Sequence, residues 1–228
     1  MDPIIIAVDG FSSCGKSTLA KALAKRLNYA YMDTGAMYRA LTLYFLRNNI
    51  NLKSCSEAEI NTLIDQVDIQ FKKDTNSNGT ITMLNGEAVE DEIRGKKVSA
   101  EVSTVAQNKV VRKRMIDLQR KAGEAKGIVM DGRDIGTKVF PDAALKIFMT
   151  ADKNIRAARR FSELQTKGVE ITFDEVYENL NFRDKNDTER EENPLRKAED
   201  AVLLDNSNLT PSEQLNFVLD LIQEKFST

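Results

Sequence analysis

The sequence has no histidine and only two cysteines among its 228 residues. Without histidine, the chain cannot build a Ser-His-Asp or Cys-His catalytic arrangement, nor a zinc site ligated by histidine. Cys14 and Cys55 have neither the spacing of a metal site nor the number needed for a disulfide framework. Any catalysis therefore has to depend on Lys, Arg, Asp, Ser, Thr and a bound metal ion.

The sequence also lacks a strong net charge and long apolar runs. The formal charge is −2 at pH 7, which gives no global field to attract nucleic acid or an anionic membrane. No apolar run approaches the roughly 20 residues that cross a bilayer, and an apolar strand that starts at Ile4 leaves no room for a signal peptide. We therefore expect a cytoplasmic protein with no nucleic-acid or membrane partner. Its length is enough to bury a sizeable α/β core.

A phosphate-binding motif lies near the N-terminus. The segment Gly10–Ser17 follows the apolar run Ile4–Val8, precedes the helix-forming run Thr18–Ala24 and has the spacing Gly-x4-Gly-Lys-Ser. This is the P-loop, in which backbone N–H groups surround a β-phosphate at the positive end of a helix dipole. Lys16 would reach the β- and γ-phosphates, and the hydroxyl of Ser17 would bind Mg²⁺. The motif predicts binding of a nucleoside triphosphate.

Strands alternate with helices along most of the predicted chain. The expected strands are 4–8, 29–32, 127–130, 144–149 and 201–204, and the expected helices include 18–24, 36–48, one from Ser56, 92–107, 110–122, 154–166, 172–190 and 211–226. Apolar strands separated by helices predict a parallel sheet covered on both faces. Residues 67–89 alternate in polarity instead, with a turn cluster at Thr75–Gly79 and the hairpin signal Asn85-Gly86, so they predict a small antiparallel insert.

Arginines outside the P-loop indicate a second substrate that carries phosphate. Switch GTPases read guanine with Asn-Lys-x-Asp, but the one Asn-Lys pair here continues as Asn108-Lys109-Val110-Val111. Arginines instead recur in separate segments, in places where ligands bind in α/β folds or on one helical face: Arg39, Arg133, Arg183 and Arg190. The planar guanidinium fork binds phosphate oxygens in a bidentate way, so this pattern suits a phosphorylated acceptor.

Five segments together resemble the bacterial cytidylate kinases, a family of P-loop nucleoside monophosphate kinases. They are Gly10–Ser17, Asp33–Arg39, Gly132–Thr137, Val139–Ala143 and Arg183–Arg190. The resemblance covers nearly the whole chain, and it implies a three-layer α/β P-loop fold with a parallel five-stranded sheet, a small antiparallel β insert and a helical lid. It implies one kinase domain, 1–228, with a core at about 1–35, 124–155 and 198–228, a monophosphate-binding region at about 36–123 and a lid at about 156–197.

The resemblance also implies an activity and the residues for it. ATP would donate its γ-phosphoryl group to CMP or dCMP, with Mg²⁺ as cofactor. The implied ATP-binding residues are Gly10, Phe11, Ser12, Ser13, Cys14, Gly15, Lys16, Ser17, Thr18 and Arg159. The implied CMP-binding residues are Thr34, Arg39, Ser103, Arg112, Arg133, Asp134, Arg183, Asp187 and Arg190. The implied catalytic residues are Lys16, Arg133, Arg159 and Arg190, and the implied metal-binding residue is Ser17.

Within the CMP set, Ser103, Arg112 and Asp134 align with positions that read cytosine, and Arg183 and Asp187 with positions that contact the sugar. A carboxylate that accepts from the cytosine amino group would face an unpaired acceptor in uracil. A mobile lid would bring Arg159 and Arg160 to the donor.

The expected reaction needs no general base, because a phosphate monoester with a second pKa near 6 is already anionic at neutral pH. Two alternatives stay open at this point. The first is a P-loop kinase for a hydroxyl acceptor, in which Asp33 would act as the base. The second is a nucleotide-dependent binding module that docks through residues 67–91.

Two further expectations concern association and Cys14. We expect a monomer, since no conspicuous apolar patch remains unassigned. Cys14 is either a small filler of the P-loop or a thiolate stabilised by the helix N-terminus and Lys16 and open to oxidants.

Overall fold

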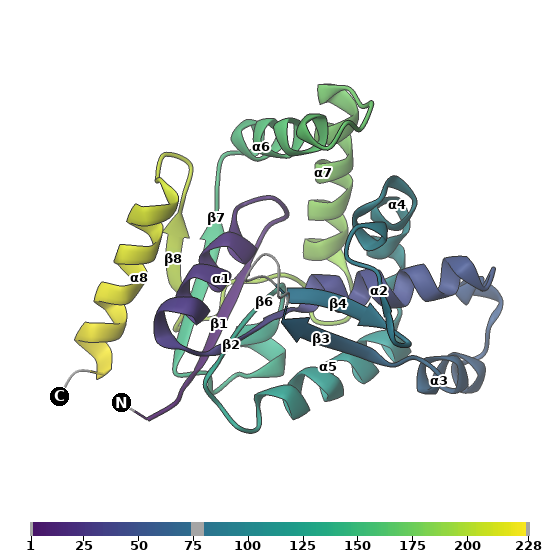
Figure 1. Cartoon of the computed structure of the whole chain (residues 1–228), viewed down its shortest axis with the longest axis horizontal. Helices are drawn as coiled ribbons and strands as arrows, with labels where there is room; N and C mark the ends of the chain where they lie inside the picture. Colours follow the sequence, from purple (N-terminus) through teal and green to yellow (C-terminus); the bar gives the residue numbers. More distant parts are fainter. Residues whose placement is uncertain (1, 74–79, 227–228) are drawn as a thin grey trace. The chain divides into compact units, whose positions relative to one another are not determined.

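The computed structural model describes residues 2–73 and 80–226, so the turn cluster predicted at Thr75–Gly79 lies outside the described residues. The chain divides into two compact units, one formed by Met1–Met32 with Gly123–Thr228 and the other by Asp33–Ala122. Figure 1 labels most of the helices and strands of the chain. No helix of the described part is long and apolar enough to cross a membrane. The predicted division into core, monophosphate-binding region and lid stays a prediction.

The first unit is built on a five-stranded sheet with the order β2-β6-β1-β7-β8. The strands are β1 (Ile5–Gly10), β2 (Ala30–Asp33), β6 (Ile128–Gly132), β7 (Leu145–Thr150) and β8 (Val202–Asp205). The central strand β1 pairs in parallel with β6 and β7, and β7 pairs in parallel with β8. All five strands were expected, and each lies within two residues of its predicted position. The parallel sheet of the expected fold class is confirmed.

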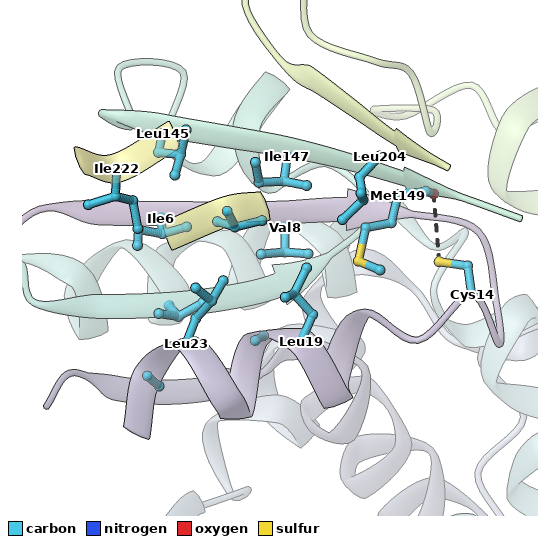
Figure 2. Close-up of a cluster of buried hydrophobic side chains, with 14 of the residues drawn as sticks. Ile6, Val8, Cys14, Leu19, Leu23, Leu145, Ile147, Met149, Leu204 and Ile222 are labelled. Atoms are coloured by element: carbon cyan, nitrogen blue, oxygen red, sulfur yellow. Dashed lines mark hydrogen bonds between the residues drawn. The ribbon is translucent and has the colours of Figure 1, made fainter. Parts of the chain in front are cut away.

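Two helices cover one face of this sheet, α1 (Lys16–Leu27) and α8 (Pro211–Phe226). Leu19 and Leu23 of α1 and Ile222 of α8 pack against the sheet side chains in the main apolar core (Figure 2). The neighbouring residues Ile6 and Ala7 point to opposite faces of β1 and are both fully buried. Both faces of the sheet are therefore covered, as the apolar runs predicted.

A helical hairpin follows β7 in the same unit, formed by α6 (Lys153–Thr166) and α7 (Phe173–Glu189). Its apolar cluster includes Ala157 and Leu164 of α6 and Val176 and Leu180 of α7. Thr172 and Glu175 form a capping box at the start of α7, each side chain accepting the backbone N–H of the other. This hairpin covers most of the segment predicted as the lid.

The second unit consists of helices and a small three-stranded sheet. Its helices are α2 (Thr34–Arg47), α3 (Glu57–Asp65), α4 (Lys96–Val105) and α5 (Lys109–Gly123), which ends at the unit boundary. Its antiparallel strands are β3 (Ile69–Lys73), β4 (Thr80–Leu84) and β5 (Glu87–Ala88). The two-residue turn between β4 and β5 has positive φ at Asn85 and Gly86, 49° and 84°, as a type I′ hairpin requires. The predicted antiparallel insert is confirmed.

Two local predictions differ from the structure. The helix predicted over 92–107 is divided into a 3₁₀ turn, η2 (Glu92–Arg94), and α4, because Gly95 is extended, with ψ of 165°. A π-helical turn, η3 (Ile135–Val139), follows the Gly132–Asp134 segment, where no helix was predicted. π-Turns often occur at functional sites, and η3 directly follows two of the predicted CMP-binding residues.

Candidate functional site

The P-loop joins β1 to α1, and glycine is required at both of its ends. Gly10 has a φ of 147°, and a Cβ there would lie 2.0 Å from the carbonyl oxygen of Met149 on β7. Gly15 has a φ of 91°, in the left-handed region, and is the N-cap of α1. Only glycine takes these conformations without strain, so both glycines of the motif have a backbone reason for their positions.

The N-terminus of α1 is free to bind an anion. Its N-cap Gly15 has no side chain that could cap the helix, and the first turn, Lys16-Ser17-Thr18, has no acidic residue. The first N–H groups of a helix lack intrahelical partners and carry partial positive charge. The loop is therefore suited to hold a phosphate group, as the motif predicted.

Lys16 is a buried cation at this helix start. Its Nζ donates to the carbonyl oxygen of Phe11 at 2.6 Å, so the side chain folds back over the loop. Burial lowers the pKa of Lys16, and the nearby charge of Arg133 lowers it further. An anionic ligand would offset both effects, which fits the expected role of Lys16 toward phosphates.

Ser17 lies beside a carboxylate that the sequence reasoning missed. The Ser17 hydroxyl donates to Asp131 Oδ2 at 2.9 Å, and the Tyr31 hydroxyl donates to Asp131 Oδ1 at 2.8 Å. Mg²⁺ prefers oxygen ligands and is often held by one or two protein groups together with substrate phosphates. The described residues include no group of three acidic, Cys or His side chains able to hold a metal alone. Ser17 and Asp131 fit Mg²⁺ that arrives with ATP. The signal for Asp131 was its place at the end of the apolar strand β6.

Five predicted acceptor residues lie in one buried, charged cluster of the first unit. They are Arg133, Asp134, Arg183, Asp187 and Arg190. Arg133 donates to Asp187 at 2.6 Å and to the hydroxyl of Ser12 in the P-loop at 2.8 Å. Arg190 lies 3.5 Å from Asp187 and 3.6 Å from Asp134. The structure thus brings together all the CMP-binding residues predicted in this unit.

This cluster has more positive than negative side chains. Although burial acts to raise it, the pKa of Asp187 is lowered by Arg133, Arg190 and Arg183. Burial, and then the charge of Arg133, lowers the pKa of Arg183 to about 10. The Nε atom of Arg183 is buried and has no hydrogen-bond partner. Three guanidiniums against two carboxylates leave an excess positive charge that an anionic ligand would balance.

Among the arginines of α6, Arg156 contacts the P-loop, whereas the predicted donor-side residues Arg159 and Arg160 have other partners. Arg156 is buried, donates to the carbonyl oxygen of Ser12 at 3.1 Å and to Asp184 at 2.7 Å, and its guanidinium lies 5.2 Å from the Phe11 ring centroid. Arg159 is directed instead to the loop after β8, where it donates to Asn206 Oδ1 at 3.0 Å and to the Asn206 carbonyl at 2.9 Å. Arg160 pairs with Glu163 of its own helix. The donor-side roles of Arg159 and Arg160 stay predictions, while no signal in the sequence singled out Arg156.

Asn206 connects Arg159 to the P-loop. Its side-chain amide is buried, donates to the carbonyl oxygen of Cys14 and lies 3.3 Å from the side-chain oxygen of Gln214 on α8. Arg159 is thus linked to the loop through Asn206 in this structure.

The predicted acceptor residues of the second unit are Thr34, Arg39, Ser103 and Arg112. Arg39 on α2 donates to the carbonyl of Ile93 at 3.3 Å and to the hydroxyl of Ser99 at 3.1 Å. Ser103 and Arg112 are both buried; Arg112 lies 5.7 Å from the Tyr38 ring centroid, and its Nε has no hydrogen-bond partner. Arg112 Nη1 donates to the carbonyl oxygen of Ala106 at 3.1 Å, so the buried guanidinium is held in place on α5.

Asp33 and Cys14 both contribute to local structure, Asp33 as a helix cap and Cys14 as a core residue. Asp33 is the N-cap of α2, accepts the N–H of Ala36 at 2.9 Å and lies 3.4 Å from Arg94. Cys14 is fully buried in the main core, with its thiol directed to the carbonyl of Met149 at 3.6 Å (Figure 2). The burial of Cys14 supports its interpretation as a small filler, since a reactive thiol needs access to solvent.

Known proteins similar to this one match it over nearly its whole length. A family model described as cytidylate kinase matches residues 6–224. The cytidylate kinase of Bacteroides fragilis is 51% identical over 220 residues, which are 96% of each chain. That of Parabacteroides distasonis is 50% identical over 221 residues, again 96% of each chain. Among solved structures, an uncharacterized protein from Eubacterium ventriosum has a TM-score of 0.54 at 14% identity, covering 98% of this chain and 99% of the other, which supports the fold alone.

Proposed function

The chain belongs to the cytidylate kinase family, and from this premise we propose that it transfers the γ-phosphoryl group of ATP to CMP or dCMP, with ADP and CDP or dCDP as products. The observation that carries the proposal is the family match over 6–224. The P-loop and the buried arginine cluster in the first unit support it independently, because they offer separate sites for a donor and an acceptor phosphate.

On the donor side, residues 10–18 hold the phosphates of ATP. The N–H groups of the loop and of the first turn of α1 surround the β-phosphate, and Lys16 exchanges the Phe11 carbonyl for phosphate oxygens. Arg156 of α6 supports the P-loop at Ser12, and Arg159 of the same helix acts at the donor from beside Asn206, to which it donates.

The residues fit Mg²⁺ as the cofactor. Ser17 and Asp131 would hold it, since their oxygens are already within hydrogen-bond distance of each other. When bound, the metal ion neutralises charge on the transferred phosphoryl group.

On the acceptor side, arginines bind and orient the phosphate of CMP. Arg133 and Arg190 give up part of their contact with Asp187 to phosphate oxygens. Arg39 of α2 is a further arginine proposed to bind CMP. Arg183 and Asp187 contact the sugar. Ser103, Arg112 and Asp134 read cytosine, with the carboxylate of Asp134 accepting from the amino group and disfavouring uracil.

The reaction proceeds without a general base. The attacking oxygen belongs to a phosphate monoester that is anionic at neutral pH, so the protein only has to align two anions and reduce their repulsion. Asp33 would be the base for a hydroxyl acceptor, but its carboxylate already caps α2 and lies beside Arg94. This geometry, together with the family, leaves no observation in favour of the hydroxyl-acceptor kinase.

We also propose a monomer that functions in the cytoplasm. Its two cysteines are free thiols, as is usual in a reducing compartment. Sedimentation equilibrium at micromolar concentration should give the mass of one 25.6 kDa chain, and a dimer would contradict the proposal.

The proposed function is tested by measuring ADP release with ATP, Mg²⁺ and one acceptor at a time. CMP and dCMP should give strong turnover, UMP weak turnover, and AMP and GMP almost none. If ATP binds but no nucleoside monophosphate is phosphorylated, the assignment of the acceptor is wrong.

The base-reading role of Arg112 has a matched control on the same helix, because Arg114 is exposed and pairs with Asp65 at 2.9 Å. Arg112→Met should lower kcat/KM for CMP by roughly tenfold to a hundredfold, reduce the preference for CMP over UMP and leave KM for ATP unchanged. Arg114→Met should behave as the parent enzyme. Unchanged CMP selectivity in Arg112→Met would remove Arg112 from the site.

A further inference from the structure

Asp9 is a buried carboxylate that none of the roles above uses. It is the residue before Gly10, near the end of β1, and its side chain accepts two backbone hydrogen bonds. Oδ1 accepts the N–H of Ile135 at 2.8 Å, and Oδ2 accepts the N–H of Gly136 at 2.7 Å. Two successive N–H groups that converge on one carboxylate form an anion-binding nest. Here the anion comes from the protein itself.

The two N–H groups belong to the start of the π-turn η3. Within this turn, Val139 and Phe140 donate to the carbonyls of Asp134 and Ile135, at 3.1 and 2.7 Å. The first N–H groups of a helical turn have no partner inside it, and Asp9 supplies one for each of Ile135 and Gly136. The carboxylate therefore fixes where the turn begins.

Arg133 and Asp134 are the two residues immediately before this turn. Asp134 has φ of −142° and ψ of 26°, outside regular structure, so its conformation depends on what holds its neighbours. On one side the chain is fixed by β6, which ends at Gly132, and on the other by the contact of Asp9 with Ile135 and Gly136. These two anchors enclose only Arg133 and Asp134.

A carboxylate at this position is energetically demanding. Burial raises the pKa of Asp9 to about 6, the two N–H groups oppose that shift, the charge of Asp134 adds to it and that of Lys16 opposes it. Lys146 also borders the turn, since its Cδ would lie 3.1 Å from a Cβ added at Gly136. A buried charge persists where its hydrogen bonds compensate for lost hydration, and these bonds are to η3.

We propose that Asp9 is a positioning residue for the phosphoryl acceptor, acting through η3 on Arg133 and Asp134. The proposal rests on the acceptor roles proposed above for those two residues. Because Asp9 is covalently joined to Gly10, the same strand end fixes both the start of the donor loop and the acceptor residues. In-line transfer is sensitive to displacements of about 1 Å, so a direct link between the two loops sets the alignment of the reacting oxygens.

The test begins with Asp9→Asn, which keeps the shape of the side chain. An amide offers one acceptor oxygen, and its NH₂ group faces the second backbone N–H, so one of the two bonds is lost. We expect KM for CMP to rise about tenfold and the preference for CMP over UMP to fall, while KM for ATP stays within about twofold of the parent value.

A second variant changes the same contact at its donor, the backbone of Gly136. Gly136→Ala keeps the carboxylate but places a Cβ 3.1 Å from Lys146 and 3.4 Å from Asp9 Oδ2. It should shift the turn and produce the same pattern, which keeps the proposal testable if Asp9→Asn does not fold. Asp200→Asn is the control, because Asp200 pairs with Lys146 at 2.9 Å but has an exposed side chain, and its kinetics should match the parent enzyme.

Two results would overturn the proposal. One is an equal rise in both KM values, which indicates a general structural role; the other is unchanged kinetics in both Asp9→Asn and Gly136→Ala. The variant Asp134→Ala tests separately whether Asp134 binds the acceptor, the assumption on which the Asp9 proposal rests. If Asp134→Ala retains the parent KM and selectivity for CMP, the assignment itself is wrong.

Discussion

At the residue scale, the arginines of α6 differ sharply in what they contact. Arg156 binds a carbonyl of the P-loop and a carboxylate of α7, whereas Arg159 binds the loop after β8. Each guanidinium has several donors in a fixed plane, so its position is determined by the acceptors that surround it. The role of an arginine in this site follows from those acceptors more than from its place along the helix.

Arg156→Lys tests the contact with the P-loop. Nη1 of Arg156 binds Ser12 and Asp184 while Nε donates to the Ala151 carbonyl at 3.1 Å; lysine keeps the positive charge but has one nitrogen and cannot make all three contacts, so the P-loop loses a support. We expect kcat/KM for ATP to fall about tenfold, with protein that remains folded by circular dichroism. Arg26→Lys, an exposed change in α1, serves as the control. Parent-like kinetics for ATP in Arg156→Lys would exclude a role at the donor site.

At the element scale, the caps determine where helices start. Capping boxes at Ser56, Thr172 and Thr210 begin α3, α7 and α8, and each can be read from a Ser or Thr followed three residues later by Glu. The box at Thr172 matters most for the site, because α7 carries Arg183 and Asp187 near its other end.

Thr172→Ala should lower stability without changing the chemistry. Losing one capping hydrogen bond costs about 1 kcal/mol, which corresponds to a fall in Tm of about 2–4 °C for a chain of this size. Differential scanning calorimetry measures it. Thr166→Ala provides the comparison, since that hydroxyl only bonds back to Ser162 inside α6, and its Tm should hardly change. Equal Tm values for the two variants would mean that the box does not stabilise α7.

Local signals account for most of what could be predicted from the sequence. The P-loop, the capping boxes and the Asn85-Gly86 turn depend on neighbours in the chain, so their residues specify them directly. The division of the 92–107 helix at Gly95 and the π-turn at 135–139 depend on packing around them. One extended glycine and one five-residue π-turn leave no mark on the apolar periodicity on which the predictions rely.

In the candidate site, too, features specified by sequence neighbours were predicted and features that depend on distant contacts were not. Arg133, Arg183 and Arg190 were singled out by their positions in the sequence and Asp134 and Asp187 by the family resemblance, and the structure gathers all five in one cluster. Asp131, Arg156 and Asn206 were missed, because their importance comes from contacts with residues at least 114 positions away: Ser17, Ser12 and Cys14. Only Asp131 had a signal in the sequence, as an acid that ends an apolar strand.

At the scale of the whole molecule, buried carboxylates influence stability in opposite directions. The pKa of Asp9 is raised in the folded protein, to about 6, so its contribution is present at low pH and is lost as pH rises through 6. The pKa of Asp187 is lowered by its arginines, so its contribution is present at neutral pH and is lost in acid. The free energy of unfolding therefore varies with pH through both the Asp9 contribution and the Asp187 contribution.

The Asp9 contribution can be isolated by comparing the parent chain with Asp9→Asn. Between pH 5 and pH 7 the parent should lose about 1 kcal/mol of stability relative to the variant, because only the parent has to ionise a buried carboxyl group. Urea unfolding at several pH values measures the difference. A difference that does not change with pH would mean that Asp9 titrates as an ordinary, exposed carboxyl group.

The position of β1 in the middle of its sheet has a consequence for how the chain is made. Ile6 pairs with Val129 on one side and with Leu145 on the other, so β1 has no sheet partner until more than 120 further residues have been synthesised. The unit Asp33–Ala122 is continuous in sequence and has its own apolar core, so its contacts are complete earlier. During synthesis, the strand that leads into the P-loop therefore forms its sheet contacts only after β6 and β7 have been made.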